Sequence, residues 1–535
     1  MCADDSEKKS KAPLVVQQPS PFPATAKASK WPVRLLIVLA CLVALFVLFH
    51  VEENWRGERD WSAYKQQMEA RGEKLDLAAY IPPRVPDDQN FAMTPFLAPL
   101  FDFDPATGKL RKTDALKRTQ SFANSLPIGG PSGRAAGRCT DLVAWKEAMQ
   151  KPVDKDNPIV VRQKTRTAQE RAAAAPAVLA ALKQYEPVIE ELRAASQRPH
   201  CRFNLPYEAE NPILIQTPCT GTFMTVCRVV ALRASAELAL GQTEQALADL
   251  KLVFRIADTT QSDFLTGYLV ATTERDMALQ IVWEGLANHQ WSDAQLQTLQ
   301  AKLQSMDCLR HSYHALKVEQ AFSGNALFDY LKKQAPGEVL NTLLFTSAFT
   351  SLETETRSPL SVVICHMAPR GWIQFDQLNY NRCFEEQLFP VFDMTARRIY
   401  PQRAKQSEQA TEETGISCVW RHRVMTQMFL SSIVPIARRS AQAQTTVDEA
   451  ALACALERCR IANGRFPDSL TALVPGFIAK LPHDIITGEP LKYRRDGDGF
   501  VLYSVGWNEK DDGGVPAAKG DDSQGDWVWQ CPAKK

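Results

Sequence analysis

An uninterrupted apolar segment near the N-terminus constrains this chain more than any other feature. Fifteen apolar residues follow one another over Leu35–Phe49, and the apolar region as a whole covers Trp31–Val51. A helix of about 20 residues spans the roughly 30 Å hydrocarbon core of a bilayer, and tryptophan favours the interface on either side. Trp31 and Trp55 bracket the segment at suitable positions. The pattern therefore predicts a single transmembrane helix over residues 31–51.

A cleaved signal peptide and a buried core helix are the two alternatives for this segment. A signal peptide has a short leader and a small-x-small cleavage site, whereas here 30 residues precede the segment and residues 49–53 offer no such site. A core helix normally keeps a polar face, which this segment lacks. We therefore expect a retained membrane anchor.

The basic residues beside the segment indicate its orientation. Three of them follow it and are interleaved with acidic residues: Arg56, Arg59 and Lys65. Five precede it and a sixth lies at its N-terminal end: Lys8, Lys9, Lys11, Lys27, Lys30 and, within the segment, Arg34. By the positive-inside rule the N-terminus is cytoplasmic and the bulk of the chain extracytoplasmic, as in a single-pass protein of the inner (cytoplasmic) membrane. Residues 1–30, rich in Lys, Ser, Pro and Ala, predict a disordered cytoplasmic tail.

The composition is that of a globular protein. Of 535 residues, 45% are hydrophobic and 23% charged, which excludes a wholly disordered chain or a small disulfide scaffold. The 62 basic and 61 acidic residues nearly cancel, so no global field attracts nucleic acid and we expect no nucleic-acid partner.

Helical periodicity dominates most of the chain after the anchor. Residues 52–135 form an irregular juxtamembrane region with short helices, and residues 136–445 an α-helical outer domain. We expect a mainly α fold. The predicted helices are Trp61–Lys74, Thr167–Gln197 with breaks at Pro176 and Pro187, Phe223–Leu240, Thr243–Asp258, Ala294–Gln304 with Ser292 as its N-cap, Met306–Lys333, Leu340–Leu352 and Trp372–Tyr400 with an interruption at Pro390.

A helical hairpin stands out within this region. Phe223–Leu240 and Thr243–Asp258 are separated by Gly241, and Ala246 and Leu250 occupy small and large packing positions. The pair resembles a single tetratricopeptide unit, a resemblance that implies a protein-binding role. A generic helical hairpin is the alternative.

Two groups of metal-ligand side chains are candidate sites. Helical spacing allows two of Cys308, His311 and His314 to share a metal ion, with a solvated helix face as the alternative. Cys365-His366-Met367 offers soft ligands suited to copper, with a loop near the core as the alternative. The sequence contains no H-E-x-x-H, G-x-S-x-G or dinucleotide fingerprint. We therefore expect a non-enzymatic protein, although a hydrolase site assembled from scattered His, Asp and Cys residues stays open.

A second apolar stretch, Val424–Ala437, lies between basic pairs within Arg421–Arg439. It is too short and too polar to span a bilayer. We expect it to pack in the core, with a membrane-surface helix as the alternative.

The last 90 residues change character. Ala450–Ile461 predicts a helix that stops at Asn463-Gly464. Two short runs beginning at Leu491 and at Phe500 predict an antiparallel hairpin packed on that helix. Residues 446–535 are therefore expected to form a small α+β domain.

The order of residues in this domain resembles the globular domain of type II secretion major pseudopilins. The matching positions are Asn463-Gly464-Arg465-Phe466-Pro467, Leu470, Leu473, Leu481-Pro482, Asp484, Gly488, Pro490, Tyr493, Tyr503-Ser504, Gly506, Asp511-Asp512-Gly513-Gly514, Gly525-Asp526, Trp527 and Trp529. The layout of the whole chain also resembles uncharacterised, membrane-anchored bacterial envelope proteins that end in the same module. Pseudopilins carry a processing site directly before their own apolar helix, whereas this chain has its apolar segment some 400 residues upstream without such a motif.

The pseudopilin resemblance implies a calcium ion in the loop after the last strands. Clustered carboxylates suit calcium, which takes about six to eight oxygen ligands. A solvated acidic loop is the alternative. The candidate ligands are Asp511, Asp512, Asp521, Asp522 and Asp526. Cys459 and Cys531 lie in the same small domain and are candidates for a disulfide.

The leading hypothesis is a non-enzymatic, membrane-anchored envelope protein with a protein-interaction or scaffold role, whose partners are other envelope proteins. A subunit of a type II secretion-like apparatus is the first alternative, and the hydrolase is the second. The sequence does not identify a small-molecule ligand.

Overall fold

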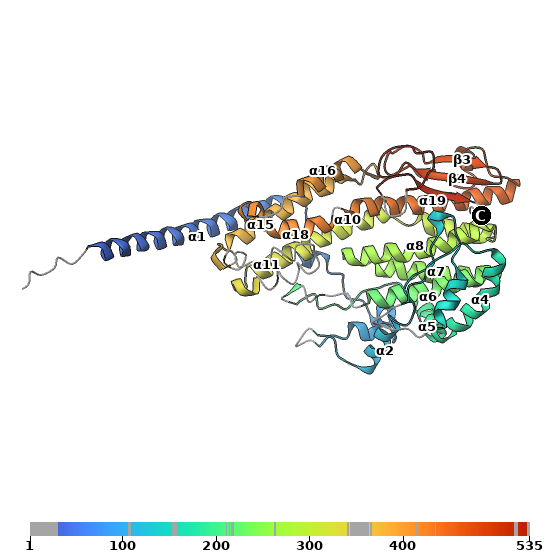
Figure 1. The fold of residues 1–535 in the computed structure, drawn as a ribbon, viewed down its shortest axis with the longest axis horizontal. Coiled ribbons are helices and arrows are strands. Elements are labelled where there is room, and N and C mark those ends of the chain that lie inside the picture. Colours follow the sequence, from blue (N-terminus) through green and yellow to red (C-terminus); the bar gives the residue numbers. More distant parts are fainter. Residues whose placement is uncertain are drawn as a thin grey trace, which may run out of the picture. The chain divides into compact units, whose positions relative to one another are not determined.

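The fold is that of a computed structural model in which a long N-terminal helix precedes a mainly helical body with small antiparallel sheets toward the C-terminus (Figure 1). The structure describes residues 30–104, 109–151, 159–209, 211–212, 215, 219–261, 264–339, 342, 363, 366–411, 416–433, 435–517 and 523–531. It divides into two compact units, Met1–Glu52 and Glu53–Lys535. The expected helical class is confirmed.

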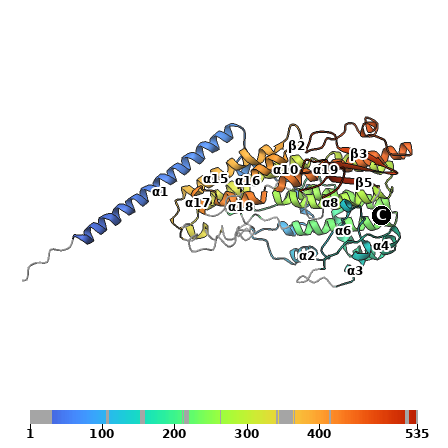
Figure 2. The same cartoon turned by 45° about the horizontal axis from the view of Figure 1, so that its top comes forward.

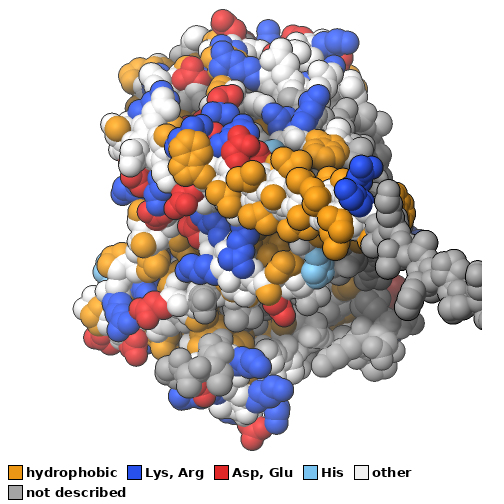
Figure 3. All heavy atoms as spheres, turned by 90° about the vertical axis from the view of Figure 1, so that its left-hand side faces the viewer, with side chains coloured by type: hydrophobic (Ala, Val, Ile, Leu, Met, Phe, Trp, Pro, Cys, Tyr) orange, Lys and Arg blue, Asp and Glu red, His pale blue; other side chains and the backbone are white. Residues whose placement is uncertain are grey.

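Helix α1 (Trp31–Ala70) contains the apolar segment. Among the described residues it is the one helix long and apolar enough to cross a membrane, and the side chains of its apolar window are unburied. Exposed large hydrophobic side chains run along it from Trp31 to Val51. The space-filling view in Figure 3 shows a continuous hydrophobic surface bordered by lysine and arginine side chains. Length and composition fit a membrane anchor, and a signal sequence meets the same criteria.

The predicted helix Trp61–Lys74 is not a separate element. It forms the C-terminal part of α1, which continues without a break and ends at Ala70. Gly57, the one glycine within this helix, lies against the start of α15 (Gly371–Cys383), where an added Cβ would approach the Gly371 carbonyl oxygen to 2.6 Å. Close packing of the two helices at this point requires glycine.

The middle of the chain forms a stack of helices. Helices α6, α7 and α8 pack side by side, α4 lies on α6, and α3 lies on α4. The helices are α2 (Asp114–Phe122), α3 (Leu142–Met149), α4 (Ala168–Leu182), α5 (Glu186–Ala195), α6 (Thr220–Ala239), α7 (Thr243–Thr260), α8 (Leu265–Ala287), α9 (Asp293–Gln304), α10 (Cys308–Glu319) and α11 (Leu327–Leu331). Shorter helical turns are η1 (Leu77–Tyr80), η2 (Asp87–Gln89), η3 (Phe91–Met93), η4 (Ala98–Phe101), η5 (Arg134–Ala136), η6 (Lys183–Tyr185) and η8 (Gln320–Ala326).

Several predicted helices are confirmed. Helices α6 and α7 form the expected hairpin, and Gly241 between them has a positive φ of 74°. Ser292 caps α9 by accepting a hydrogen bond from the Gln295 backbone N–H, as its position predicted. Most of the predicted helix Leu340–Leu352 lies outside the described residues.

A buried ion pair joins α4 to α8. The Arg171 guanidinium donates to the Glu284 carboxylate, and both side chains are buried. The same carboxylate accepts hydrogen bonds from the hydroxyls of Thr140 at 2.6 Å and Ser235 at 2.7 Å, and from the Gln280 amide at 3.0 Å. A buried charge is stable only when it is paired and hydrogen-bonded. Glu284 therefore fixes α4, α6 and α8 relative to one another.

The C-terminal third places a sheet on a long helix. Helix α19 packs on α8, α9 and α10, and strands β4 and β5 pack against it. The sheet is antiparallel in the order β3-β4-β5, with Leu502 of β4 opposite Trp529 of β5. The remaining elements are η9 (Phe384–Leu388), η10 (Phe389–Val391), β1 (Phe392–Asp393), β2 (Arg398–Ile399), α16 (Pro401–Thr411), α17 (Ile416–Trp420), α18 (Val424–Ile433), α19 (Pro435–Asn463), η11 (Leu470–Leu473), β3 (Lys492–Asp496), β4 (Gly499–Ser504) and β5 (Trp527–Cys531).

The predicted helix Trp372–Tyr400 is wrong over its last part. The chain leaves the helix at Phe392 and forms the antiparallel pair β1–β2. The Asp393 carboxylate accepts the backbone N–H groups of Thr395 and Ala396, at 3.1 and 2.8 Å, and Arg397 has a positive φ of 51°. These local hydrogen bonds favour a turn over continued helix.

The expected hairpin near the C-terminus is confirmed as β3–β4, and Gly464 ends α19 with a positive φ of 77°. The expected boundary between residues 445 and 446 falls inside α19, whose buried side chains continue from Ile436 to Cys459. The sheet has a third strand, β5, which pairs with β4 and which the sequence pattern did not predict. Helix α18 buries Met425, Met428 and Leu430, so core packing of this stretch is confirmed.

The candidate disulfide between Cys459 and Cys531 is not formed. Both are free thiols. The Cys459 sulfur accepts from the Asn463 amide at 3.3 Å, and the Cys531 thiol donates to the Leu286 carbonyl at 3.6 Å. Burial raises the pKa of Cys531 to about 12, which keeps this thiol protonated.

The close contact between Gly285 and Trp291 predicts that a larger side chain at position 285 lowers stability. A Cβ at Gly285 would lie 2.1 Å from the indole nitrogen of Trp291, which is buried and donates to the Val282 carbonyl at 3.1 Å. Gly285→Ala should therefore lower the free energy of unfolding by roughly 1–3 kcal/mol, measured by denaturant titration. The matched control is Gly337→Ala, where nothing lies within 4 Å and no loss is expected. A Gly285→Ala variant with an unchanged free energy of unfolding would contradict this packing.

Candidate functional site

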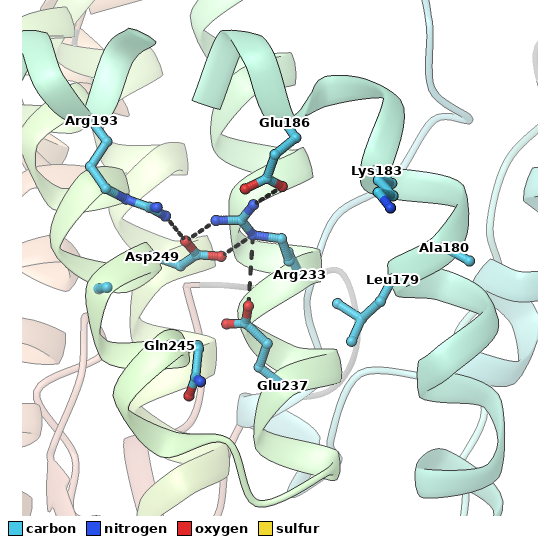
Figure 4. Close-up of a pocket in the computed structure, with 10 residues that line it drawn as sticks. Leu179, Ala180, Lys183, Glu186, Arg193, Arg233, Glu237, Gln245 and Asp249 are labelled. Atoms are coloured by element: carbon cyan, nitrogen blue, oxygen red, sulfur yellow. Dashed lines mark hydrogen bonds and ion pairs between the residues drawn. The ribbon is translucent and has the colours of Figure 1, made fainter. Parts of the chain in front are cut away.

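A charged cleft lies between the α4–α5 segment and the α6–α7 hairpin. Its volume is about 500 Å³. Thr167 begins α4 through a reciprocal capping box with Glu170, and η6 carries the chain into α5, where Pro187 stands in the first turn. Figure 4 shows side chains from both segments facing the same space, with Lys183 and Leu179 on one wall and Gln245 and Asp249 on the other.

Arg233 and Asp249 form the centre of this cleft. The Arg233 Nε and Nη2 groups donate to the two Asp249 carboxylate oxygens at 2.6 and 2.5 Å. A third Arg233 nitrogen donates to Glu186 at 2.6 Å, and Arg193 donates to Asp249 at 2.5 Å. The Asp249 side chain is 1% exposed and that of Arg233 10%. Paired guanidinium–carboxylate bonds of this geometry are strong and hold both partners in fixed orientations.

Glu237 lies one helical turn after Arg233 and is less well partnered. Its Oε1 atom is 3.8 Å from the Arg233 Nε, and its Oε2 atom has no hydrogen-bond partner among the described residues. Burial, together with the negative charge of Asp249, raises the pKa of Glu237 to about 8. Most Glu237 side chains are therefore protonated at neutral pH.

The cleft consequently has an excess of positive charge. With Glu237 neutral, its lining side chains comprise three cations and two anions: Lys183, Arg193 and Arg233 against Glu186 and Asp249. Lys183 is exposed and makes no ion pair with any described residue, and the Arg193 Nε has no hydrogen-bond partner among them. Unused donors beside an excess of positive charge suit an anionic group on a ligand.

The ionisable lining residues are lysine, arginine, glutamate and aspartate. They include no serine, cysteine, threonine or histidine side chain. A hydroxyl or thiol nucleophile and an imidazole base are therefore missing from the described lining, whereas carboxyl groups and a lysine amine, which can also act as acids, bases or nucleophiles, are present. A smaller cavity of about 250 Å³ lies beside Leu75, Asn325 and Tyr330, and its lining likewise has no serine, cysteine, threonine or histidine.

Three of the five candidate calcium ligands, Asp511, Asp512 and Asp526, lie in the described part of the acidic loop. The Asp526 carboxylate is buried and accepts backbone N–H groups from Asp512 at 3.2 Å and Gly514 at 2.6 Å. The Asp511 carboxylate accepts the Gly513 N–H at 3.0 Å, and this bond lowers the pKa of Asp511. Asp521 and Asp522 lie outside the described residues.

The predicted groups of metal ligands are not assembled within the described part of the chain, where no three His, Cys, Asp or Glu side chains could hold a metal ion. Cys308 is buried beside Arg275, with 3.5 Å between its sulfur and a guanidinium nitrogen. His314 packs edge-on to the Tyr80 ring. Cys365 lies outside the described residues.

Sequence reasoning did not identify the cleft. Arg233 and Glu237 lie among buried residues of α6, and Asp249 precedes the buried Leu250 of α7. Charged residues at positions expected to be buried were the available signal, because such groups need partners. Which partners they have depends on helix packing.

Comparisons of the chain with protein-family models, with curated proteins and with solved structures find no match. The cleft and α1 are therefore the features of the protein that bear on its function.

The raised pKa of Glu237 predicts how the stability of the folded protein changes with pH. Because its pKa in the folded protein exceeds the ordinary value of 4.5, the folded state binds this proton more tightly and stability falls as pH rises from about 4.5 to about 8. Glu237→Gln should remove this loss and stabilise the protein at pH 8 by on the order of 2 kcal/mol, with little effect at pH ~5.

The measurement is the free energy of unfolding by denaturant titration across this pH range. Glu147→Gln on α3 is the control, because Glu147 is exposed and should keep the wild-type profile. A Glu237→Gln profile parallel to that of the wild type would contradict the assignment.

Proposed function

We propose that this chain is a membrane-anchored, non-enzymatic protein of the bacterial envelope that binds an extended polypeptide segment in the charged cleft. In this proposal residues 31–51 cross the inner membrane, the N-terminus is cytoplasmic, and the body of the chain is extracytoplasmic. The apolar length of α1 and the basic residues before it support this placement.

The chemistry of the cleft supports a polypeptide ligand. Both signs of charge line the cleft, and apolar contacts come from Leu179, Ala180 and Ala248. Small-molecule pockets usually carry few polar groups, whereas seven of the ten residues that line this cleft are charged or polar. A segment that carries a carboxylate together with backbone amides would engage Lys183 and Arg193 through its acid and Glu237 through its N–H groups.

The helical hairpin supports the same function. Its resemblance to a tetratricopeptide unit implies protein binding, and α6 and α7 of this hairpin supply Arg233, Glu237 and Asp249. The single observation that carries the proposal is that the cleft lining holds an exposed lysine, Lys183, with no ion pair among the described residues, together with the weakly partnered Glu237. A lysine and a carboxyl group on the lining of one cleft can bind the carboxylate and the backbone N–H groups of one segment.

The test is site-specific photocrosslinking in native membranes. Gln245 is an exposed lining residue, and Gln245→benzoylphenylalanine in the full chain should give one discrete protein adduct. The same probe at Gln297 of α9, outside the cleft, is the control and should give none.

Charge reversal then assigns the adduct to the cleft. Lys183→Glu should reduce its yield several-fold, because the exposed ammonium attracts the acidic segment. Lys112→Glu, an equal charge change at an exposed residue before α2, should not. A yield that is independent of Lys183, or the same adduct from position 297, would refute the proposal.

A second candidate function is supported by the C-terminal region. There α19 is followed by a three-stranded antiparallel sheet and an acidic loop, in the order of the pseudopilin resemblance. This arrangement supports a subunit of a type II secretion-like apparatus. Gene neighbours that encode a secretion ATPase and an outer-membrane secretin would favour this candidate over an independent scaffold.

Calcium binding by the acidic loop belongs to this second candidate. In this candidate Asp511, Asp512 and Asp526 would supply hard oxygen ligands, although the three carboxylates are not gathered into a metal site in the structure, and calcium takes about six to eight ligands. Asp521, Asp522 and loop carbonyl groups would have to complete the site. The buried Asp526 carboxylate, whose pKa is raised by desolvation, would gain most from a cation.

Calcium should therefore raise the melting temperature of the full chain relative to a chelator. A ligand present at a hundred times its Kd stabilises by about 2.7 kcal/mol, which corresponds to a shift of a few degrees. Asp512→Asn should abolish the shift, whereas Asp498→Asn in the β3–β4 turn should retain it. Equal melting temperatures with calcium and with chelator would remove the ion from the proposal.

A further inference from the structure

Aromatic and arginine side chains gather on one surface of the unit formed by Glu53–Lys535. They come from α1, from the start of α15 and from the turn between α17 and α18. We name this set the aromatic–arginine surface, and it consists of Arg56, Arg370, Trp372, Phe375, Trp420, Arg421 and His422. Figure 2 shows α15, α17 and α18 together at the end of this unit opposite the β3–β4–β5 sheet.

Direct hydrogen bonds hold the start of α15 on α1. The Trp372 indole N–H donates to a Glu53 carboxylate oxygen at 2.9 Å, and the Gly371 backbone N–H donates to the Asn54 side chain at 2.7 Å. Arg56 pairs with the other Glu53 oxygen at 2.9 Å. Trp372 is therefore fixed at the level of Glu53 and Asn54 along α1.

Ring contacts extend the surface from α15 to the α17–α18 turn. The Trp372 ring centroid lies 5.9 Å from that of Trp420 and 4.9 Å from that of His422. The Phe375 ring stacks on His422 at 5.0 Å, and the Arg56 guanidinium lies over the Phe375 ring at 5.7 Å. The aromatic groups thus form one connected cluster rather than isolated surface residues.

The turn that carries Trp420 is itself held in place. The Asn379 amide donates to the carbonyls of Arg421 and His422, at 3.0 and 2.9 Å. The buried Asp376 carboxylate accepts the backbone N–H groups of Met425 and Thr426 at the start of α18, at 2.8 and 3.0 Å. These bonds fix the orientation of the turn on α15, so the surface is pre-formed.

A large aromatic side chain on this surface remains exposed. Trp420 is 66% exposed, although tryptophan is among the side chains that gain most from burial. Arg370 and Arg421 flank the Trp372–Trp420 pair in sequence. Tryptophan and arginine in combination are typical of the membrane interface, where rings enter the headgroup layer and cations bind phosphate.

The surface lies close to the end of the proposed membrane span. Glu53 is the second residue after Val51, and two residues cover at most about 7 Å even when fully extended. The headgroup layer is about 5–7 Å thick on each side of the hydrocarbon core. Trp372 is hydrogen-bonded to Glu53 itself, so chain connectivity alone brings the cluster to the headgroup layer if residues 31–51 span the bilayer.

We propose that the aromatic–arginine surface docks on phospholipid headgroups, with Trp420 inserted between them and the arginines bound to lipid phosphates. This inference rests on the proposed membrane anchor and adds a second membrane contact to it. Docking would restrain the body of the chain relative to the bilayer, which a single helix with a free linker would not.

The test uses the full chain reconstituted into vesicles of phosphatidylcholine and phosphatidylglycerol. Trp420→benzoylphenylalanine should form lipid adducts on illumination. Ile461→benzoylphenylalanine in α19 is the matched control, since Ile461 is also an exposed hydrophobic side chain but lies near the C-terminal sheet, and should form few. Leu45→benzoylphenylalanine within the apolar segment reports on the anchor separately.

Charge reversal tests the role of the arginines. Arg370→Glu combined with Arg421→Glu should reduce the lipid adduct at position 420 several-fold in these vesicles, because each arginine near an anionic surface contributes to attraction. The control is Lys112→Glu combined with Arg118→Glu, which makes an equal charge change at exposed positions remote in sequence. This double variant should leave the yield of the lipid adduct at position 420 unchanged.

The outcomes separate this inference from the anchor. Lipid adducts at positions 45 and 420 but not at 461 support docking. Lipid adducts at position 45 alone overturn the inference and leave the anchor intact. A protein adduct at position 420 in native membranes, in place of a lipid adduct, has the same meaning. Absence of adducts at 45 overturns the proposed membrane anchor itself.

Discussion

The arrangement of the helical body depends on one buried carboxylate. Glu284 of α8 accepts hydrogen bonds from Arg171 of α4, Ser235 of α6 and Thr140 of the preceding segment. Loss of Arg171 would leave the buried charge of Glu284 unpaired, at a cost of about 3–5 kcal/mol. Residues of α4 and α6, the two helices that this interaction joins to α8, also line the charged cleft.

The cleft differs from the Glu284 cluster in the way its charges are satisfied. Glu284 has all its hydrogen bonds within the protein, whereas Glu237 retains an unpartnered oxygen among the described residues. Both carboxylates are buried, but only the second borders open space. Fully paired buried charges stabilise an arrangement of helices, and incompletely paired ones beside a cavity favour a ligand. This contrast is why the cleft, and not the larger buried cluster, is the candidate site.

Local sequence signals predicted several element ends correctly and failed where local and long-range preferences compete. Ser292 and Gly464 marked helix ends because capping and positive φ depend on neighbouring residues alone. The β1–β2 pair was missed because its residues have helical spacing, and Asp393 redirects the chain through its own turn. Strand β5 was missed as part of the sheet because pairing with β4 joins residues some 27 positions apart.

The amino-acid sequence alone fixed the apolar helix, the helical class and the hairpin of α6 and α7, since each follows from periodicity and hydrophobic length within a short window. The charged cleft and the aromatic–arginine surface could not be predicted in this way. Arg233 meets Asp249 across two helices, and Trp372 meets Trp420 from segments nearly 50 residues apart. Such sites arise when packing brings together side chains whose sequence spacing carries no signal of their proximity.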